Sequence, residues 1–178
     1  MVILFLILKD CMDKICVTYT HHKLGDLIWQ LPYIKAISEH HRLPIDLIVR
    51  EKTQAKNILL DLEYIENIYY NNYRKGFSYW IDVFKLSINF FKNKYNYLYM
   101  LDKVNKPGIA AKITGIKHII GPGFGNQKKW VTNEKILDPN DYKLSYSEQS
   151  QKLLEINSIS VRNKIPSLKV NIKRFEKD

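Results

Sequence analysis

The chain has 178 residues, of which 46% are hydrophobic and 26% are charged, as in an ordinary globular domain with its own core. These proportions exclude a disordered chain. The formal net charge is +10, with 28 Lys and Arg residues against 18 Asp and Glu. This excess favours anionic partners such as phosphates, a membrane surface or nucleic acid. The lysines are scattered, so a compositional bias of the genome would explain the charge equally well.

The amino-terminal stretch is apolar at residues 2–8, which is too short to span a bilayer. It also lacks the leading positive charges and cleavage site of a signal peptide. Met12 directly precedes the first predicted strand, so we expect Met12 to be the true start and residues 1–11 to lie outside the fold. Cys11 and Cys16 are expected to be free thiols, which fits a reducing compartment.

Hydrophobic periodicity predicts strands that alternate with helices. The expected strands are residues 14–20, 45–49, 65–70, 97–101 and 117–120, and the expected helices are 26–40, 52–61, 79–93, 107–115 and 146–156. Such alternation is typical of an α/β fold with a mostly parallel sheet flanked by helices through right-handed crossovers. We expect this Rossmann-like domain to span residues 12–160, and residues 161–178 to form a linker or tail.

Three of the predicted helices carry further signals. Pro32 falls inside the first helix, which therefore starts late or bends there. Ser145 and Glu148 match a capping box at the start of the last helix. The helix at 79–93 is amphipathic, and its apolar face is expected to pack on the core. That face consists of Trp80, Ile81, Phe84, Ile88 and Phe91.

The most informative segment is Lys23-Leu24-Gly25-Asp26-Leu27-Ile28, which follows the first predicted strand. It places a carboxylate at the carboxyl end of a strand and the amino end of a helix, where open α/β sheets bind ligands. Asp26 is therefore either a helix cap or a general base that takes a proton from a substrate hydroxyl. Gly25 allows a tight turn or the close approach of a ligand.

Other candidate residues follow the same edge of the predicted sheet. His22 and Lys23 precede Gly25, and Lys23 is a candidate cation for an anionic substrate or an ordinary solvated lysine. Asp102 closes the fourth strand and is a further candidate for contact with the substrate. Gly123 and Gly125 follow the fifth strand, in either a simple turn or a backbone-lined wall of a substrate cleft. The glycine spacing is not a dinucleotide fingerprint, and we expect no metal site and no nucleophilic hydrolase or redox chemistry.

The stretch from Lys23 to Ile37, with its basic-x-Gly-Asp, apolar run, Pro32 and amphipathic helix, resembles glycosyltransferase family 9, the lipopolysaccharide heptosyltransferases. Residues 45–49 resemble the second strand of that family. Residues 97–102, 110–115 and 119–121 are similar to its later strand–helix–strand unit, so the resemblance covers residues 14 to 170.

The resemblance implies one half of a GT-B fold, the amino-terminal half that holds the acceptor. The donor, an ADP-heptose-like nucleotide-sugar, would be bound mainly by a second domain that has no counterpart in this chain, and no cofactor is implied. The Asp of the family motif is the proposed catalytic base and falls on Asp26. Lys23 matches the basic position, and Gly25 would bring the backbone close to the sugars.

An inverting sugar transfer to a lipopolysaccharide-type acceptor is thus the expected function, with this chain inactive or nearly so by itself. The expected partners are an anionic glycolipid and the nucleotide-sugar, in the cytoplasm or at the inner membrane surface. The alternative is a non-catalytic basic α/β module that binds nucleic acid or another anionic polymer. Against that alternative, we expect most aromatic side chains to pack in the core.

Overall fold

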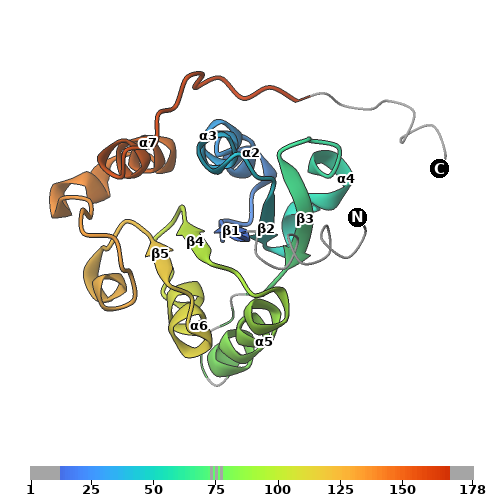
Figure 1. The fold of residues 1–178 in the computed structure, drawn as a ribbon, viewed down its shortest axis with the longest axis vertical. Helices are drawn as coiled ribbons and strands as arrows, with labels where there is room; N and C mark the ends of the chain where they lie inside the picture. Colours follow the sequence, from blue (N-terminus) through green and yellow to red (C-terminus); the bar gives the residue numbers. More distant parts are fainter. Residues whose placement is uncertain (1–12, 73, 75, 77, 169–178) are drawn as a thin grey trace, which may run out of the picture.

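The computed structural model describes residues 13–72, 74, 76 and 78–168. These residues form a parallel sheet of five strands in the order β3-β2-β1-β4-β5 (Figure 1). The strands are β1 (Ile15–Thr18), β2 (Ile45–Val49), β3 (Ile65–Tyr70), β4 (Tyr97–Met100) and β5 (His118–Ile120). The predicted Rossmann-like α/β fold is confirmed, and each strand falls on its predicted segment.

Helices cover both faces of the sheet. They are α2 (Leu24–Ile28), α3 (Leu31–His41), α4 (Lys56–Leu59), α5 (Ser78–Asn93), α6 (Lys106–Thr114) and α7 (Tyr146–Ile156). The short 3-10 helices are η1 (Glu51–Thr53), η2 (Gly125–Lys129) and η3 (Pro139–Lys143).

The break expected at Pro32 separates α2 from α3, and Pro32 lies in the first turn of α3, where its missing N–H costs no hydrogen bond. The helix predicted at 52–61 is wrong in extent. Gln54 adopts the left-handed region at φ 49° and ends η1, so only the four residues of α4 continue as an α-helix. The predicted capping box of α7 is confirmed by hydrogen bonds in both directions between Ser145 and Glu148.

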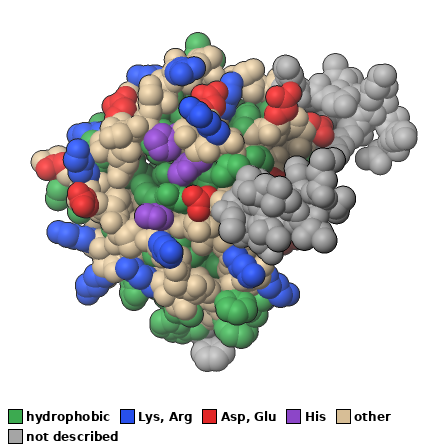
Figure 2. All heavy atoms as spheres, viewed as in Figure 1, with side chains coloured by type: hydrophobic (Ala, Val, Ile, Leu, Met, Phe, Trp, Pro, Cys, Tyr) green, Lys and Arg blue, Asp and Glu red, His purple; other side chains and the backbone are tan. Residues whose placement is uncertain are grey.

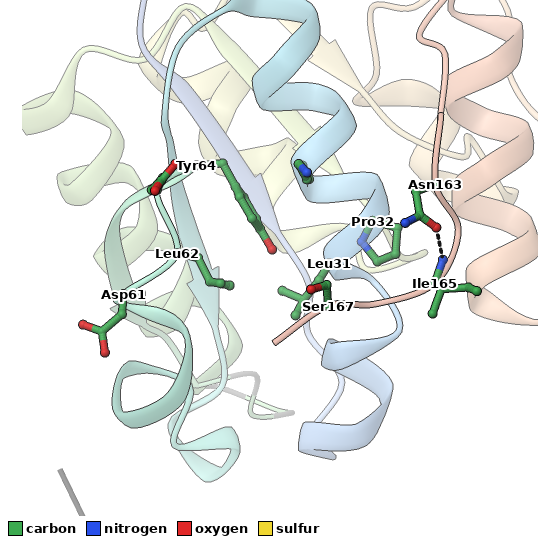
Figure 3. Close-up of a pocket in the computed structure, with 10 residues that line it drawn as sticks. Leu31, Pro32, Asp61, Leu62, Tyr64, Asn163, Ile165 and Ser167 are labelled. Carbon is green, nitrogen blue, oxygen red and sulfur yellow. Dashed lines mark hydrogen bonds between the residues drawn. The ribbon is translucent and has the colours of Figure 1, made fainter. Parts of the chain in front are cut away.

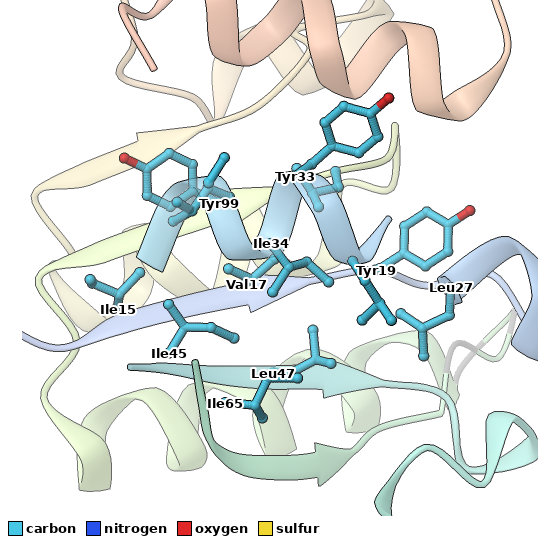
Figure 4. Close-up of a cluster of buried hydrophobic side chains, with 14 of the residues drawn as sticks. Ile15, Val17, Tyr19, Leu27, Tyr33, Ile34, Ile45, Leu47, Ile65 and Tyr99 are labelled. Atoms are coloured by element: carbon cyan, nitrogen blue, oxygen red, sulfur yellow. The ribbon is translucent and has the colours of Figure 1, made fainter. Parts of the chain in front are cut away.

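The core has two layers because alternate strand residues point to opposite faces of the sheet. Ile15 and Val17 of β1 pack toward α3 and α7, in the larger cluster of buried side chains (Figure 4). Cys16 and Ile48 point the other way, toward α5 and α6. Both faces are therefore buried, as is typical of parallel sheets, and ligands are left with the strand ends.

Helix α5 is present as predicted, but its predicted core face is wrong. The side chains that pack on the sheet are Val83, Leu86 and Phe90. The predicted stripe of Trp80, Ile81, Phe84, Ile88 and Phe91 is exposed. The helix carries two apolar stripes, and the stripe that faces the sheet is the one that lies next to a buried ion pair. Asp82, next to Val83, lies buried with its carboxylate 2.9 Å from Nζ of the equally buried Lys106 of α6.

Residues 161–168, which we expected to begin a linker, contain no helix or strand and lie along α3. Val161 and Leu168 pack against the core. Asn163, Ile165 and Ser167 form one side of a small hollow of about 210 Å³, which α3 and the segment before β3 complete (Figure 3). The expected extension at residues 1–11 lies outside the described residues.

Candidate active site

Asp26 lies at the carboxyl edge of the sheet, in the first turn of α2. The cap position is Lys23, and it makes no side-chain cap hydrogen bond. The alternative that Asp26 is the N-cap residue is therefore wrong. Its side chain is 41% exposed, so the carboxylate is open to solvent beside the amino end of a helix. The helix dipole favours a negative charge at that place.

His21 is the side chain in contact with Asp26. Its Nδ1 lies 3.6 Å from Oδ2 of Asp26, which is longer than a hydrogen bond. The imidazole stacks on Tyr19 and lies 4.0 Å, between ring centroids, from Tyr146 at the start of α7. Burial lowers the pKa of His21, although the carboxylates of Asp102 and Asp26 act in the opposite direction. At neutral pH, His21 is therefore an uncharged aromatic neighbour of Asp26.

Tyr19 completes this small aromatic group. Burial, together with the negative charges of Asp26 and Asp102, raises the pKa of Tyr19, which remains a neutral phenol. His21 was not among the residues that we expected to contact the substrate. The contact between His21 and Tyr146 could not be predicted, because the two residues lie more than a hundred positions apart and no local pattern links them.

His22 and Lys23 are both exposed in the loop before α2. Gly25 is exposed as well, and a Cβ added there would meet no heavy atom within 4 Å. Space therefore lies open above its backbone. Gly25 is helical, so the reading as a tight turn is wrong, while the close approach of a ligand stays a prediction.

Asp102 holds the site together from inside. Its side chain is buried, and its carboxylate accepts hydrogen bonds from the backbone N–H of Thr20 at 2.5 Å and of Val104 at 3.0 Å. Burial raises the pKa of Asp102 more than these hydrogen bonds lower it. A buried carboxylate with these partners positions the loop that carries His21. Asp102, which we expected to contact the substrate, is thus buried in this structure.

Gln127 ties the glycine segment to the same framework. Its buried side-chain amide donates to the carbonyl oxygen of Asp102 at 2.8 Å and accepts from the N–H of Gly123 at 2.9 Å. Gly123 has φ +77°, and an added Cβ would lie 2.7 Å from Ile136. Gly123 is thus required by the turn and the packing. The role of Gln127 could not be predicted, because residues 126–130 carry no helical pattern in the sequence, whereas the structure forms η2 there.

Gly123 and Gly125 do line a hollow of about 730 Å³ at the same edge of the sheet. Lys103, Lys128, Phe124 and Tyr142 also line it. The Nζ of Lys103 lies 3.5 Å from the centroid of the Tyr142 ring, a cation–π contact. The hollow thus combines two lysines and two aromatic rings with one carboxylate, that of Asp138, and such a lining suits a sugar-bearing ligand with a net negative charge.

Within residues 13–168, apart from the undescribed positions 73, 75 and 77, no three His, Cys, Asp or Glu side chains gather in a way that would hold a metal ion. In the same part of the chain, no helix is both long enough and apolar enough to span a bilayer.

No protein-family model and no curated protein matches this sequence. Solved structures do resemble it. A glycosyl transferase family 9 protein from Veillonella parvula DSM 2008 superimposes with a TM-score of 0.67 at 17% identity, over 90% of this chain and 45% of that one. E. coli ADP-heptose lps heptosyltransferase II gives a TM-score of 0.66 at 17% identity, over 89% of this chain and 47% of that one.

The chain thus spans less than half the length of either structure. At this identity the likeness concerns the fold. These neighbours are GT-B glycosyltransferases, so this chain has the fold of one Rossmann-like half of such an enzyme.

Proposed function

We propose that this chain is the acceptor-binding half of an inverting glycosyltransferase and that Asp26 is its general base. The observation that carries the proposal is the half-exposed carboxylate of Asp26 at the carboxyl edge of β1, in a fold shared with family 9 glycosyltransferases. A general base must reach the proton that it removes, and a solvent-open carboxylate at the ligand edge of the sheet meets that requirement.

In this mechanism, Asp26 accepts the proton of an acceptor hydroxyl while the hydroxyl oxygen forms a bond to the anomeric carbon of the donor sugar. The bond from that carbon to the nucleotide diphosphate breaks, and the diphosphate leaves with the electron pair. The configuration at the carbon is inverted because attack and departure take place on opposite faces. The transition state is oxocarbenium-like, as in glycoside hydrolysis.

The surroundings of Asp26 support a sugar acceptor that carries negative charge. Lys23, three residues before Asp26, is exposed, and Lys103 and Lys128 line the hollow at the same edge of the sheet together with Asp138. Aromatic rings lie at both places, Tyr146 near His21 and Tyr142 in the hollow. We therefore propose a lipopolysaccharide-type glycolipid as acceptor and an ADP-heptose-like nucleotide-sugar as donor, with the donor bound mainly by a second domain, at the cytoplasmic surface of the inner membrane.

The test is the rate of sugar transfer by the complete enzyme that contains this chain, with Asp26→Asn as the variant. Loss of a general base lowers kcat by about 100-fold or more. Acceptor affinity, measured by calorimetry, should change little, because Asn keeps the shape and polarity of the side chain. Glu134→Gln, which neutralises another exposed carboxylate, is the matched control and should keep the full rate. Transfer by Asp26→Asn at the control rate would remove Asp26 as the base.

A further inference from the structure

The exposed face of α5 is a large apolar surface that the proposed active site does not use. Trp80 is 61% exposed, Phe84 65% and Phe91 76%. Ile81 and Ile88 on the same helix are also exposed, as is Ile113 on α6, which packs beside α5. In Figure 2 hydrophobic side chains gather at the lower edge of the molecule, where Figure 1 places α5 and α6.

These side chains form one continuous strip along the helix. At about 100° of rotation per residue, Trp80, Phe91, Phe84, Ile88 and Ile81 fall within an arc of roughly 100°. The core-facing residues Val83, Leu86 and Phe90 occupy a different arc. The helix is therefore apolar toward the sheet and apolar again toward solvent. A strip with several exposed aromatic rings marks an interaction surface, since single exposed hydrophobic residues need no partner but clusters do.

The charge around the strip identifies its partner. The exposed charged residues of α5 and α6 are all lysines: Lys85, Lys92 and Lys112. The acid of α5, Asp82, is buried and neutralised by Lys106 and Arg74. By the same helical rotation, Lys85 and Lys92 fall directly beside the apolar arc. A second copy of this chain on the same face would oppose lysine to lysine, whereas an anionic lipid surface complements both the apolar strip and the lysines.

We infer that the exposed face of α5, with Ile113 of α6, docks this protein onto an anionic lipid membrane, with α5 lying along the surface. The aromatic rings enter the boundary between headgroups and acyl chains, and the lysine ammonium groups remain among the lipid phosphates. This inference rests on the surface alone and stands whether or not Asp26 is a base.

The test is partition of the full chain onto vesicles of phosphatidylcholine containing about 30% phosphatidylglycerol, which present an anionic surface. The variant Phe84→Asp/Phe91→Asp should lower the partition coefficient about tenfold or more, since it removes two large apolar groups from the contact. Ile165→Asp, at a side chain that is 75% exposed on residues 161–168, is the matched control and should bind like the wild type. Every protein compared keeps the apolar segment at residues 2–8, so the difference between them measures α5.

A second variant, Lys85→Glu/Lys92→Glu, should abolish the preference for anionic over neutral vesicles. Thermal melts check that each variant remains folded, which we expect because the substituted side chains are exposed. Equal binding by Phe84→Asp/Phe91→Asp and Ile165→Asp would overturn the inference, as would no binding by the wild type. A wild-type dimer that dissociates on Phe84→Asp/Phe91→Asp substitution, without vesicle binding, would assign the face to a second copy and overturn it as well.

Discussion

At the scale of single residues, distant parts of the chain supply the surroundings of the candidate base Asp26. Asp26 and Gly25 could be placed at a strand–helix junction because local hydrophobic patterns define that junction. The neighbours of Asp26 could not be predicted. Tyr146 and Asp102 reach the site through the tertiary fold, and Asp102 is a buried support where a substrate contact was expected.

The glycines provide a direct comparison between a residue with open space and one that is closely packed. Gly25→Ala should raise the free energy of unfolding by about 0.5 kcal/mol, because Ala is the better helix former and its Cβ meets no neighbour. Gly123→Ala should lower it by about 2 kcal/mol, because the residue is held at φ +77° and the Cβ would collide with Ile136. Urea denaturation of both variants measures these changes.

The same pair of variants tests the predicted ligand contact at Gly25. If sugars approach its backbone, Gly25→Ala should weaken acceptor binding although the protein is more stable. An acceptor affinity equal to that of the wild type would show that Gly25 is no ligand-contact position.

At the scale of elements, helix and strand positions were predictable, whereas the orientation of α5 was not. Its periodicity shows that apolar residues recur on the helix surface, but two stripes satisfy that pattern. The stripe that meets the sheet contains Asp82, a residue that a hydrophobic pattern would place outside. Only the tertiary pairing of Asp82 with Lys106 makes that burial favourable, because a buried charge requires a partner.

The carboxyl end of α3 carries a histidine whose environment makes stability depend on pH. His41 contacts Tyr97 and Tyr99 at the opposite, amino edge of the sheet, and its Nε2 lies 2.8 Å from the Tyr99 hydroxyl. Histidine side chains gather beside hydrophobic ones near the middle of the face drawn in Figure 2. Burial, with smaller contributions from His40 and His118, lowers the pKa of His41 to about 4, although Asp13 acts in the opposite direction.

An unfolded histidine titrates near pH 6.5, so between about pH 6.5 and pH 4 the unfolded chain binds a proton that the native protein does not. The contribution of His41 to the free energy of unfolding is therefore complete above pH 6.5 and is lost as the pH falls toward 4. His41→Gln should reduce the slope of the free energy of unfolding against pH in this range, by up to the equivalent of about one bound proton. Urea unfolding curves at a series of pH values measure this slope. An unchanged pH dependence in the variant would contradict the neutral, buried state of His41.

At the scale of the whole molecule, a chain of hydrogen bonds unites the candidate active site. Thr20 donates to Asp102, Gln127 donates to the carbonyl oxygen of Asp102, and Gly123 donates to Gln127. The loop that carries His21 and leads into α2 is thus held in one framework with the hollow beside Gly125, at the carboxyl edge of the sheet. The proposed membrane face lies on the α5–α6 layer, which covers one face of the sheet. We expected most aromatic side chains to pack in the core, but Trp80, Phe84 and Phe91 of α5 are exposed and belong to this face.

The most direct test of the account is a structure of this chain with an acceptor sugar bound. The account predicts that the attacking hydroxyl lies about 2.6–3.2 Å from a carboxylate oxygen of Asp26, the distance from which a general base removes a proton. An acceptor bound with its hydroxyl turned away from Asp26, or seated elsewhere on the molecule such as the hollow beside Ile165, would contradict it.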